Sequence, residues 1–326
     1  MYSKYRTLSD TLSLVKSSVD IPRDAIVDQI ILKLKVSLKN AGAEAFSGDN
    51  EDILRAIQEI RVISDGSTVH YSLSAADAVI LNGFNSKAGA APDLAGVVSV
   101  PAGETKEFEY LIRLDEGDIL AASKDSLEIK TVVNPAVAEG VTITGFEGMI
   151  TIVENVLTTE EFVESYGANL EFRAEPKVYC LTAAVNASSE ITNVLDMPTG
   201  SLMRAGVLQF MTNGKAGEVD PSKVGLIVTS PDRRELLNVD WATLRGVNAS
   251  EYDVSGAAPE GVAYINYAKD VTADGYGLRG WRFTKGDYQV VAKTDKTATL
   301  RYISLEHVVT SGVFDQAEHA VLERTR

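Results

Sequence analysis

Three short segments of this sequence occur twice, in the same order and at comparable separations along the chain. The matched segments are 20–22 with 196–198, 76–83 with 239–246, and 113–118 with 282–287. Each match is weak alone, because Gly-Asp turns and strands that begin beside a proline are common. The ordered set favours a two-fold internal repeat. A chain of 326 residues would then consist of two similar domains of about 150–170 residues each.

Between the turn signals, the sequence alternates in the manner of half-buried β-strands. In segment 26–38 the apolar residues Leu32, Leu34, Val36 and Leu38 alternate with Lys33, Lys35 and Ser37, which places the two sets on opposite faces of a strand. Other predicted strands cover 59–64, 97–100, 107–114, 127–133, 141–153, 201–211, 224–229, 262–267, 279–283, 288–293 and 298–309. Many short strands separated by turns are typical of antiparallel sandwiches or barrels.

Helices are predicted to be few and short. The candidates are 52–57, 75–81, 159–166 and 240–244, with Ser74 and Thr158 as N-caps of the second and third. The helix near residue 159 interrupts the strands at the expected joint between the repeats. We therefore predict an N-terminal arm over 1–18, a first β-sandwich over 19–165 and a second over 166–326.

The composition argues against several kinds of chemistry. A formal net charge of −15, from 46 acidic and 31 basic residues, repels phosphate and disfavours nucleic-acid binding by the whole surface. The single cysteine, Cys180, excludes an intrachain disulfide, and we expect it to be a buried, inert thiol. The three histidines, His70, His307 and His319, are far apart and without metal-binding spacing. They are expected at the surface or at strand ends, and we predict no cofactor, metal or catalytic site.

Two local motifs have plain structural interpretations. Gly275, Gly277 and Gly280 satisfy the G-x-G-x-x-G pattern, but a strand-like segment follows where a dinucleotide site requires a helix, so a glycine-rich turn is favoured. The acidic segment 48–52 lacks the glycine and final glutamate of an EF-hand. It is favoured as a solvated loop or as the first turn of the following helix.

The first eighteen residues are locally basic in an acidic protein. The basic and aromatic residues of this arm are Tyr2, Lys4, Tyr5, Arg6 and Lys16. Leu8, Leu12 and Val15 also follow helical spacing. Two interpretations remain open at this point: a frayed terminus or helix that packs on its own domain, or an arm that contacts an anionic membrane or a neighbouring subunit.

The layout of the chain resembles a known family. Its parts are the N-terminal arm, the segment 20–26 before a long strand, the short helix ending at 81–83, the Val-Pro-Ala-Gly turn at 100–103, and the second-copy segments 197–204, 240–241 and 286–287. This arrangement resembles the major capsid proteins of the double jelly-roll, adenovirus-like lineage. In size it is similar to those of tailless icosahedral phages and archaeal viruses that contain an internal membrane.

The resemblance implies an all-β protein of two tandem eight-stranded jelly rolls, with a few short helices and the N-terminal arm. It also implies a virion structural protein, not an enzyme, that is held in the host cytoplasm before assembly. Its partners would be further copies of itself, in pseudo-hexameric homotrimers that tile an icosahedral shell, and minor capsid or vertex proteins. The arm would face the internal membrane, and no sequence-specific contact with nucleic acid is expected.

Two other classes of function are weighed against this one. A tandem jelly-roll lectin or adhesin would bind carbohydrate through exposed aromatic side chains, for which the candidates are Tyr252, Tyr264, Tyr276 and Trp281. An enzyme on a β-sandwich, such as a carbohydrate hydrolase or a bicupin, is a further alternative. The shortage of histidines argues against the bicupin.

Overall fold

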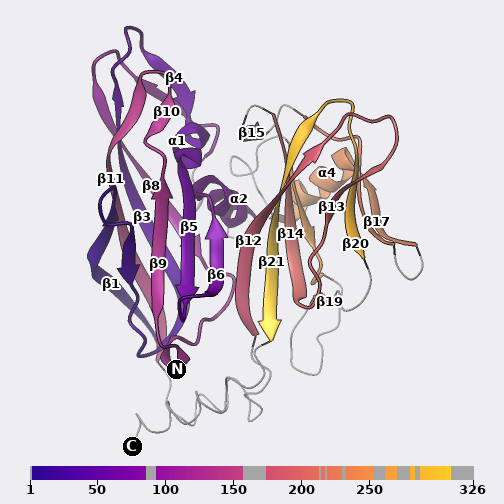
Figure 1. Ribbon diagram of the computed structural model, residues 1–326, viewed down its shortest axis with the longest axis horizontal. Helices are drawn as coiled ribbons and strands as arrows, with labels where there is room; N and C mark the ends of the chain where they lie inside the picture. The colour runs from indigo at the N-terminus through magenta and orange to yellow at the C-terminus, as the bar shows by residue number, and fades with distance from the viewer. Residues whose placement is uncertain are drawn as a thin grey trace, which may run out of the picture. The chain divides into compact units, whose positions relative to one another are not determined.

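A computed structural model shows a protein built largely of antiparallel strands (Figure 1). It describes residues 2–85, 93–156, 174–212, 214–216, 219–229, 233–252, 261–269, 280–282 and 287–309. These residues divide into two compact units. Unit 1 is formed mainly by the described residues within 2–82 and 93–178, and unit 2 mainly by those within 179–307. The predicted boundary at 165–166, the predicted helix at 159–166 and its N-cap Thr158 lie outside the described residues.

Unit 1 contains two antiparallel sheets. The first has the order β1 (Tyr2–Ser13), β11 (Val141–Val156), β3 (Ile26–Asn40) and β8 (Thr105–Leu114), with β10 (Ala136–Ala138) paired to β11. The second contains, in order, β6 (Thr68–Leu73), β5 (Ile57–Ser64), β9 (Leu127–Val133) and β2 (Ser18–Asp20). A separate pair joins β4 (Phe46–Asp49) to β7 (Val97–Val100), and the helical segments are α1 (Asn50–Ala56), α2 (Ala75–Asn85) and the 3-10 turn η1 (Ala121–Ser123).

Strand β3 confirms the alternation expected from its sequence. Leu32, Leu34, Val36 and Leu38 are fully buried between the sheets, while the lysines between them reach solvent. Because β3 lies between β11 and β8, both of its edges are hydrogen-bonded. It is therefore an interior strand of its sheet, as is β11.

Local sequence signals set the turns and helix starts of unit 1. The hairpin between β5 and β6 turns at Asp65 and Gly66, whose φ angles of 53° and 71° are those of a tight hairpin turn. The side chain of Asp49 accepts a hydrogen bond from the backbone N–H of Asp52, and the side chain of Asp52 accepts one from the backbone N–H of Asp49. The acidic segment 48–52 is therefore a capping box. Ser74 caps α2 in the same way, as predicted.

Unit 2 also contains two sheets. In the first, β12 (Ala174–Val185) is followed by β21 (Ala298–Val309) and β14 (Leu202–Thr212), and the far edge of β14 pairs with β15 (Lys215–Ala216), β18 (Val262–Asn266) and β19 (Trp281–Arg282). The second has the order β13 (Thr192–Asp196), β20 (Tyr288–Lys293), β16 (Lys223–Val228) and β17 (Arg234–Asp240). Helix α4 (Trp241–Tyr252) follows β17 directly.

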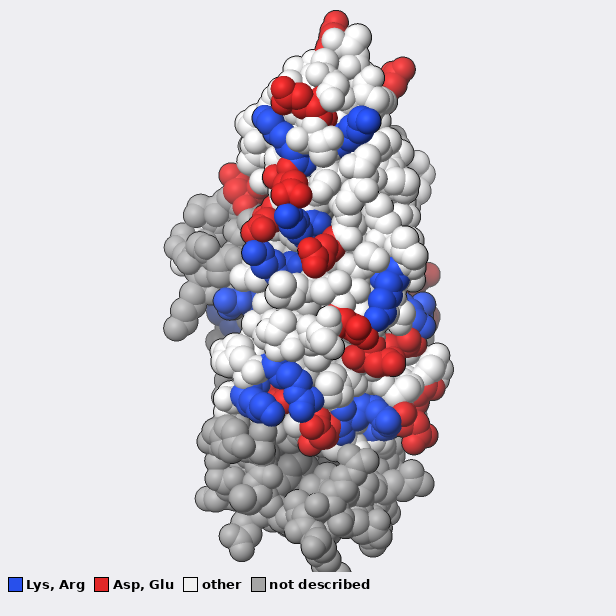
Figure 2. Space-filling view, turned by 90° about the vertical axis from the view of Figure 1, so that its left-hand side faces the viewer, with Lys and Arg blue, Asp and Glu red and all other residues white. Residues whose placement is uncertain are grey.

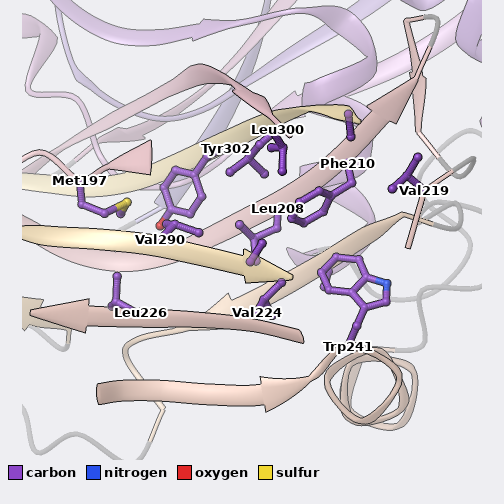
Figure 3. Close-up of a cluster of buried hydrophobic side chains, with 14 of the residues drawn as sticks. Met197, Leu208, Phe210, Val219, Val224, Leu226, Trp241, Val290, Leu300 and Tyr302 are labelled. Carbon is purple, nitrogen blue, oxygen red and sulfur yellow. The ribbon is translucent and has the colours of Figure 1, made fainter. Parts of the chain in front are cut away.

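A cluster of buried side chains joins the two sheets of unit 2 (Figure 3). Phe210 on β14 meets Trp241 of α4 edge-to-face, with ring centroids 5.4 Å apart. The indole of Trp241 donates to Asp220 at 2.9 Å, so its one polar atom is satisfied inside the core. Leu208 and Tyr302 complete the centre of the cluster, and both are fully buried. The cluster holds helix α4 against the strands that precede it.

The strand order of unit 2 repeats that of unit 1. The series β6-β5-β9-β2 corresponds to β17-β16-β20-β13, and β1-β11-β3-β8 corresponds to β12-β21-β14-β18. The helices α2 and α4 follow the corresponding strands β6 and β17. The matched sequence segments fall at equivalent places in this scheme, because 20–22 and 196–198 end β2 and β13, and 76–83 and 239–246 belong to the helix starts. The internal repeat in the sequence therefore corresponds to a repeat in the order in which the strands are connected and paired.

Candidate functional site

The basic N-terminal segment forms an edge strand. Residues 2–13 make up β1, which pairs along its length with β11. Among the described residues no strand pairs with its other edge. Leu12 is fully buried whereas Val15 is 97% exposed, so Leu8, Leu12 and Val15 do not share one helical face and the expectation from their spacing is wrong. The backbone pairing with β11 has overridden a weak helical pattern.

Arg6 is fixed to unit 1 by two carboxylates. Its guanidinium forms a bidentate pair with Asp24 at 2.9 and 3.1 Å and lies 3.2 Å from the buried carboxylate of Glu154, in ionic contact but without hydrogen-bond geometry. The hydrogen bond from Arg6 lowers the pKa of Asp24. Burial raises the pKa of Glu154, and the charge of Arg6 opposes that rise. The positive charge of Arg6 is therefore balanced by two carboxylates of unit 1, the unit to which Arg6 itself belongs.

The other candidate contact residues differ in how available they are. Lys16 forms an ion pair with Asp10 at 2.8 Å, and its backbone N–H donates to the hydroxyl of Ser13 in the turn after β1. Lys4 is exposed, and Tyr5 is 69% exposed. Tyr2 pairs with Val156 through the backbone. Among the candidate contact residues whose side chains are described, Lys4 and Tyr5 are the most accessible to a partner.

Charges of both signs alternate over the outer face of the β1-β11-β3-β8 sheet, as Figure 2 shows. Lys33 on β3 pairs with Glu109 on β8 at 2.9 Å, and Lys35 pairs with Glu107 at 2.9 Å. All four side chains are about half exposed, so each pair contributes little to stability. Such a mixed surface offers no basic patch for a polyanion.

Two groups of charged residues are buried in unit 1. Arg55 on α1 contacts Asp77 at 2.6 Å and Glu51 at 3.0 Å, which ties α1 to α2. Lys124 and Glu175 form a second pair at 2.7 Å, with both side chains almost fully buried. The other oxygen of Glu175 accepts the backbone N–H of Leu120 at 3.3 Å. These contacts are internal and satisfied, as expected of structural ion pairs.

His70 lies in the interior, contrary to the expected surface position. It is 1% exposed, and its Nε2 lies 2.9 Å from the hydroxyl of Ser64, which is itself buried. Burial lowers the pKa of His70. Because neither group is accessible, this serine–histidine pair has no route to a substrate. His307 lies on β21, and His319 is outside the described residues.

The titration of the Asp28 carboxyl group should make the thermal stability of the protein depend measurably on pH. Burial, followed by the hydrogen bond and charge of Asp118, raises the pKa of Asp28 from 3.8 to about 6. The folded state therefore holds a proton that the unfolded chain releases, and this contribution to stability is lost as the pH rises from about 4 through 6. We expect Asp28→Asn to raise the Tm above pH 6 and to change it little near pH 4. Circular-dichroism melting at several pH values tests this, and a pH-independent shift would contradict it.

The described residues contain no group of three or more histidine, cysteine or acidic side chains placed to hold a metal ion. Cys180 is partly exposed on β12 rather than buried as expected. The glycine motif at 275–280 lies outside the described residues except for Gly280. Within the described part of the chain, no helix is long and apolar enough to cross a membrane.

The aromatic residues expected to bind carbohydrate are engaged in packing. Tyr264 is 6% exposed and meets Tyr252 edge-to-face with centroids 5.0 Å apart. The hydroxyl of Tyr252 accepts a hydrogen bond from Asn266 at 3.1 Å. Trp281 packs on buried Tyr267 at 5.2 Å. Tyr276 lies outside the described residues. Tyr264 is therefore buried, contrary to the expected exposure, whereas Tyr252 and Trp281 are partly exposed and take part in packing.

The described residues thus present open strand edges and faces of mixed charge. No family model matches the sequence, and no curated protein matches it. Several solved structures, in contrast, are similar to this chain. The major capsid protein of Sulfolobus turreted icosahedral virus is 20% identical with a TM-score of 0.81, over 97% of this chain and 99% of that one.

Two more distant structures share the same architecture. The major capsid protein P2 of bacteriophage PM2 is 12% identical with a TM-score of 0.60, over 95% of this chain and 99% of that one. The Faustovirus major capsid protein is 8% identical with a TM-score of 0.62, over 95% and 90%. In each case the similarity covers both units of this chain. The protein therefore has the double jelly-roll fold, as its sequence layout predicted.

Proposed function

We propose that this protein is a viral major capsid protein that assembles into pseudo-hexameric homotrimers and then into an icosahedral shell. The observation that carries the proposal is the repeat of strand order between the two units, together with similarity to capsid proteins over nearly the whole chain. Two similar domains in each of three chains give six near-equivalent sides, which suit hexagonal packing. Its site of action would be the virion capsid, and it would have no enzymatic role.

The acidity of the chain fits a subunit that stays soluble before it assembles. A net charge of −15 opposes premature association through mutual repulsion. Assembly would then depend on matched edges and on minor capsid or vertex proteins. We also propose that the shell encloses a lipid membrane. In the N-terminal segment, Lys4 and Tyr5 would carry a membrane contact, because Arg6 and Lys16 already have acidic partners.

The trimer is the first testable consequence. Size-exclusion chromatography with multi-angle light scattering should give a mass three times the 35.1 kDa of one chain. The trimer should persist on dilution to micromolar concentration. A monomeric mass at every concentration up to that used for assembly would overturn the proposal. A monomer that binds immobilised glycans would instead favour the lectin alternative.

A further inference from the structure

A buried polar cluster holds the segment 174–178, where the chain leaves unit 1. These residues belong to unit 1 and directly precede the main part of unit 2. The cluster contains His70 on β6, Ser64 on β5, Lys124 next to η1, and Glu175 in the segment itself, and all of these side chains are buried. Their contacts therefore face little competition from water, and a change in charge among them would be costly.

The contacts of His70 are those of a neutral imidazole. Its Nε2 lies 2.9 Å from the hydroxyl oxygen of Ser64, and the ring is also hydrogen-bonded to the backbone of Pro176. Proline has no backbone N–H, so Pro176 can only accept, and the ring nitrogen that contacts it must carry a proton. In a neutral ring the other nitrogen then accepts the hydroxyl proton of Ser64. The neutral form thus satisfies both partners, one on β5 and one in segment 174–178.

The charges around His70 are already balanced without it, because Glu175 forms an ion pair with Lys124 at 2.7 Å. Burial lowers the pKa of His70, and the charge of Lys124 acts in the same direction. The carboxylates of Glu175 and the exposed Asp65 act in the opposite direction. A charged His70 would therefore share one buried carboxylate with Lys124. Its Nε2 would also carry a proton, so the Ser64 hydroxyl would have to turn its own proton away.

We infer that His70 is an acid-sensitive latch, which holds segment 174–178 on unit 1 in its neutral form and releases the segment on protonation. Release would separate Pro176 from the ring and admit water, which solvates an imidazolium far better than the interior does. A buried neutral histidine that must become charged is one of the ways in which acid opens a folded protein. The latch lies inside unit 1 and acts independently of the proposed assembly.

Acid weakens the latch because the released ring binds a proton more readily than the buried one. Above pH 6.5, the ordinary pKa of histidine, the ring is neutral in both states and the attachment has its full strength. Below that pH the released form is protonated first, so each further pH unit can weaken the attachment by up to about tenfold. Asp28 has the opposite dependence, because its stabilising proton is lost as the pH rises through about 6. The latch therefore has to be measured locally and not through the melting of the whole protein.

Hydrogen–deuterium exchange followed by mass spectrometry tests the latch in the full-length protein. Exchange is measured at about pH 7.5 and about pH 5.5, on either side of the histidine titration, and is corrected for the pH dependence of the chemical exchange rate. Amides of segment 174–178 should lose about tenfold in protection at the lower pH. Amides of 205–211 on β14, in unit 2, should keep theirs. Equal protection of segment 174–178 at both pH values in the wild-type protein would overturn the latch, independently of any variant.

Two glutamine variants separate His70 from the other titratable groups. The amide in His70→Gln can still donate to Pro176 and accept from Ser64, but it does not titrate. Protection of segment 174–178 in this variant should therefore be the same at both pH values. His307→Gln on β21 is the matched control and should retain the loss seen in the wild-type protein. If His70→Gln loses as much protection as the wild type at the lower pH, another group such as Glu175 drives the release and the role of His70 is overturned.

Discussion

Replacement of Glu175 by alanine is expected to lower the free energy of unfolding of unit 1 by about 3–5 kcal/mol. The change leaves the ammonium group of Lys124 buried without its partner, since both side chains are about 5% exposed and lie 2.7 Å apart. It also removes the acceptor of the Leu120 N–H. Urea denaturation followed by circular dichroism measures the loss. A change below about 1 kcal/mol, the value typical of exposed pairs, would show that the pair is not desolvated.

A double variant separates the buried charge from other effects of the substitution. In Glu175→Ala/Lys124→Met no charge remains at this site, and apolar replacement of a buried pair is often neutral. We expect this variant to recover most of the stability lost in Glu175→Ala. The exposed pair of Lys35 and Glu107 supplies the second control, because Glu107→Ala should cost less than about 1 kcal/mol.

Phe210→Ala is expected to lower the free energy of unfolding of unit 2 by about 3–5 kcal/mol. Phe210 is fully buried on β14, and its ring supports Trp241 of α4 edge-to-face. Alanine would leave a cavity between the sheets that the surrounding strands cannot fill, because both edges of β14 are paired. Near-ultraviolet circular dichroism should also show loss of the Trp241 signal, since the indole loses its packing partner.

Differential scanning calorimetry can assign each loss to a unit. The core of each unit is its own, so Phe210→Ala should shift the transition of unit 2 and Glu175→Ala that of unit 1. Leu236→Ala is the control for apolar truncation, because Leu236 is 37% exposed at the sheet edge and should change stability by less than about 0.5 kcal/mol. An effect of Phe210→Ala as small as this would contradict the core described for unit 2.

The strands that could be predicted are those that bury one face. β3 alternates because its even-numbered side chains from Leu32 to Leu38 fill the core, and β8 alternates for the same reason. Helix α2 could be predicted with its cap, Ser74, and the structure shows that Asp49 and Asp240 likewise cap the first turns of α1 and α4. Periodicity and capping are local signals that a single sequence retains.

Two of the strands that were not predicted, β1 and β17, are edge strands. Among the described side chains of β1, Leu12 alone is fully buried, and in β17 most side chains are exposed, so neither strand has a two-residue apolar period. Their pairing depends on backbone hydrogen bonds to β11 and β16, which leave no pattern in side-chain polarity. The contacts of Arg6 with Glu154 and of Lys124 with Glu175 also join residues far apart in sequence.

Electron microscopy of the purified, untreated protein tests the central claim most directly. If the two repeated jelly rolls of each chain form one third of a ring, class averages should show particles with three-fold symmetry and a near-hexagonal outline. At assembly concentration these particles should form sheets or closed shells. Single two-lobed particles at all concentrations, with no three-fold class, would contradict the assignment of this chain as a major capsid protein.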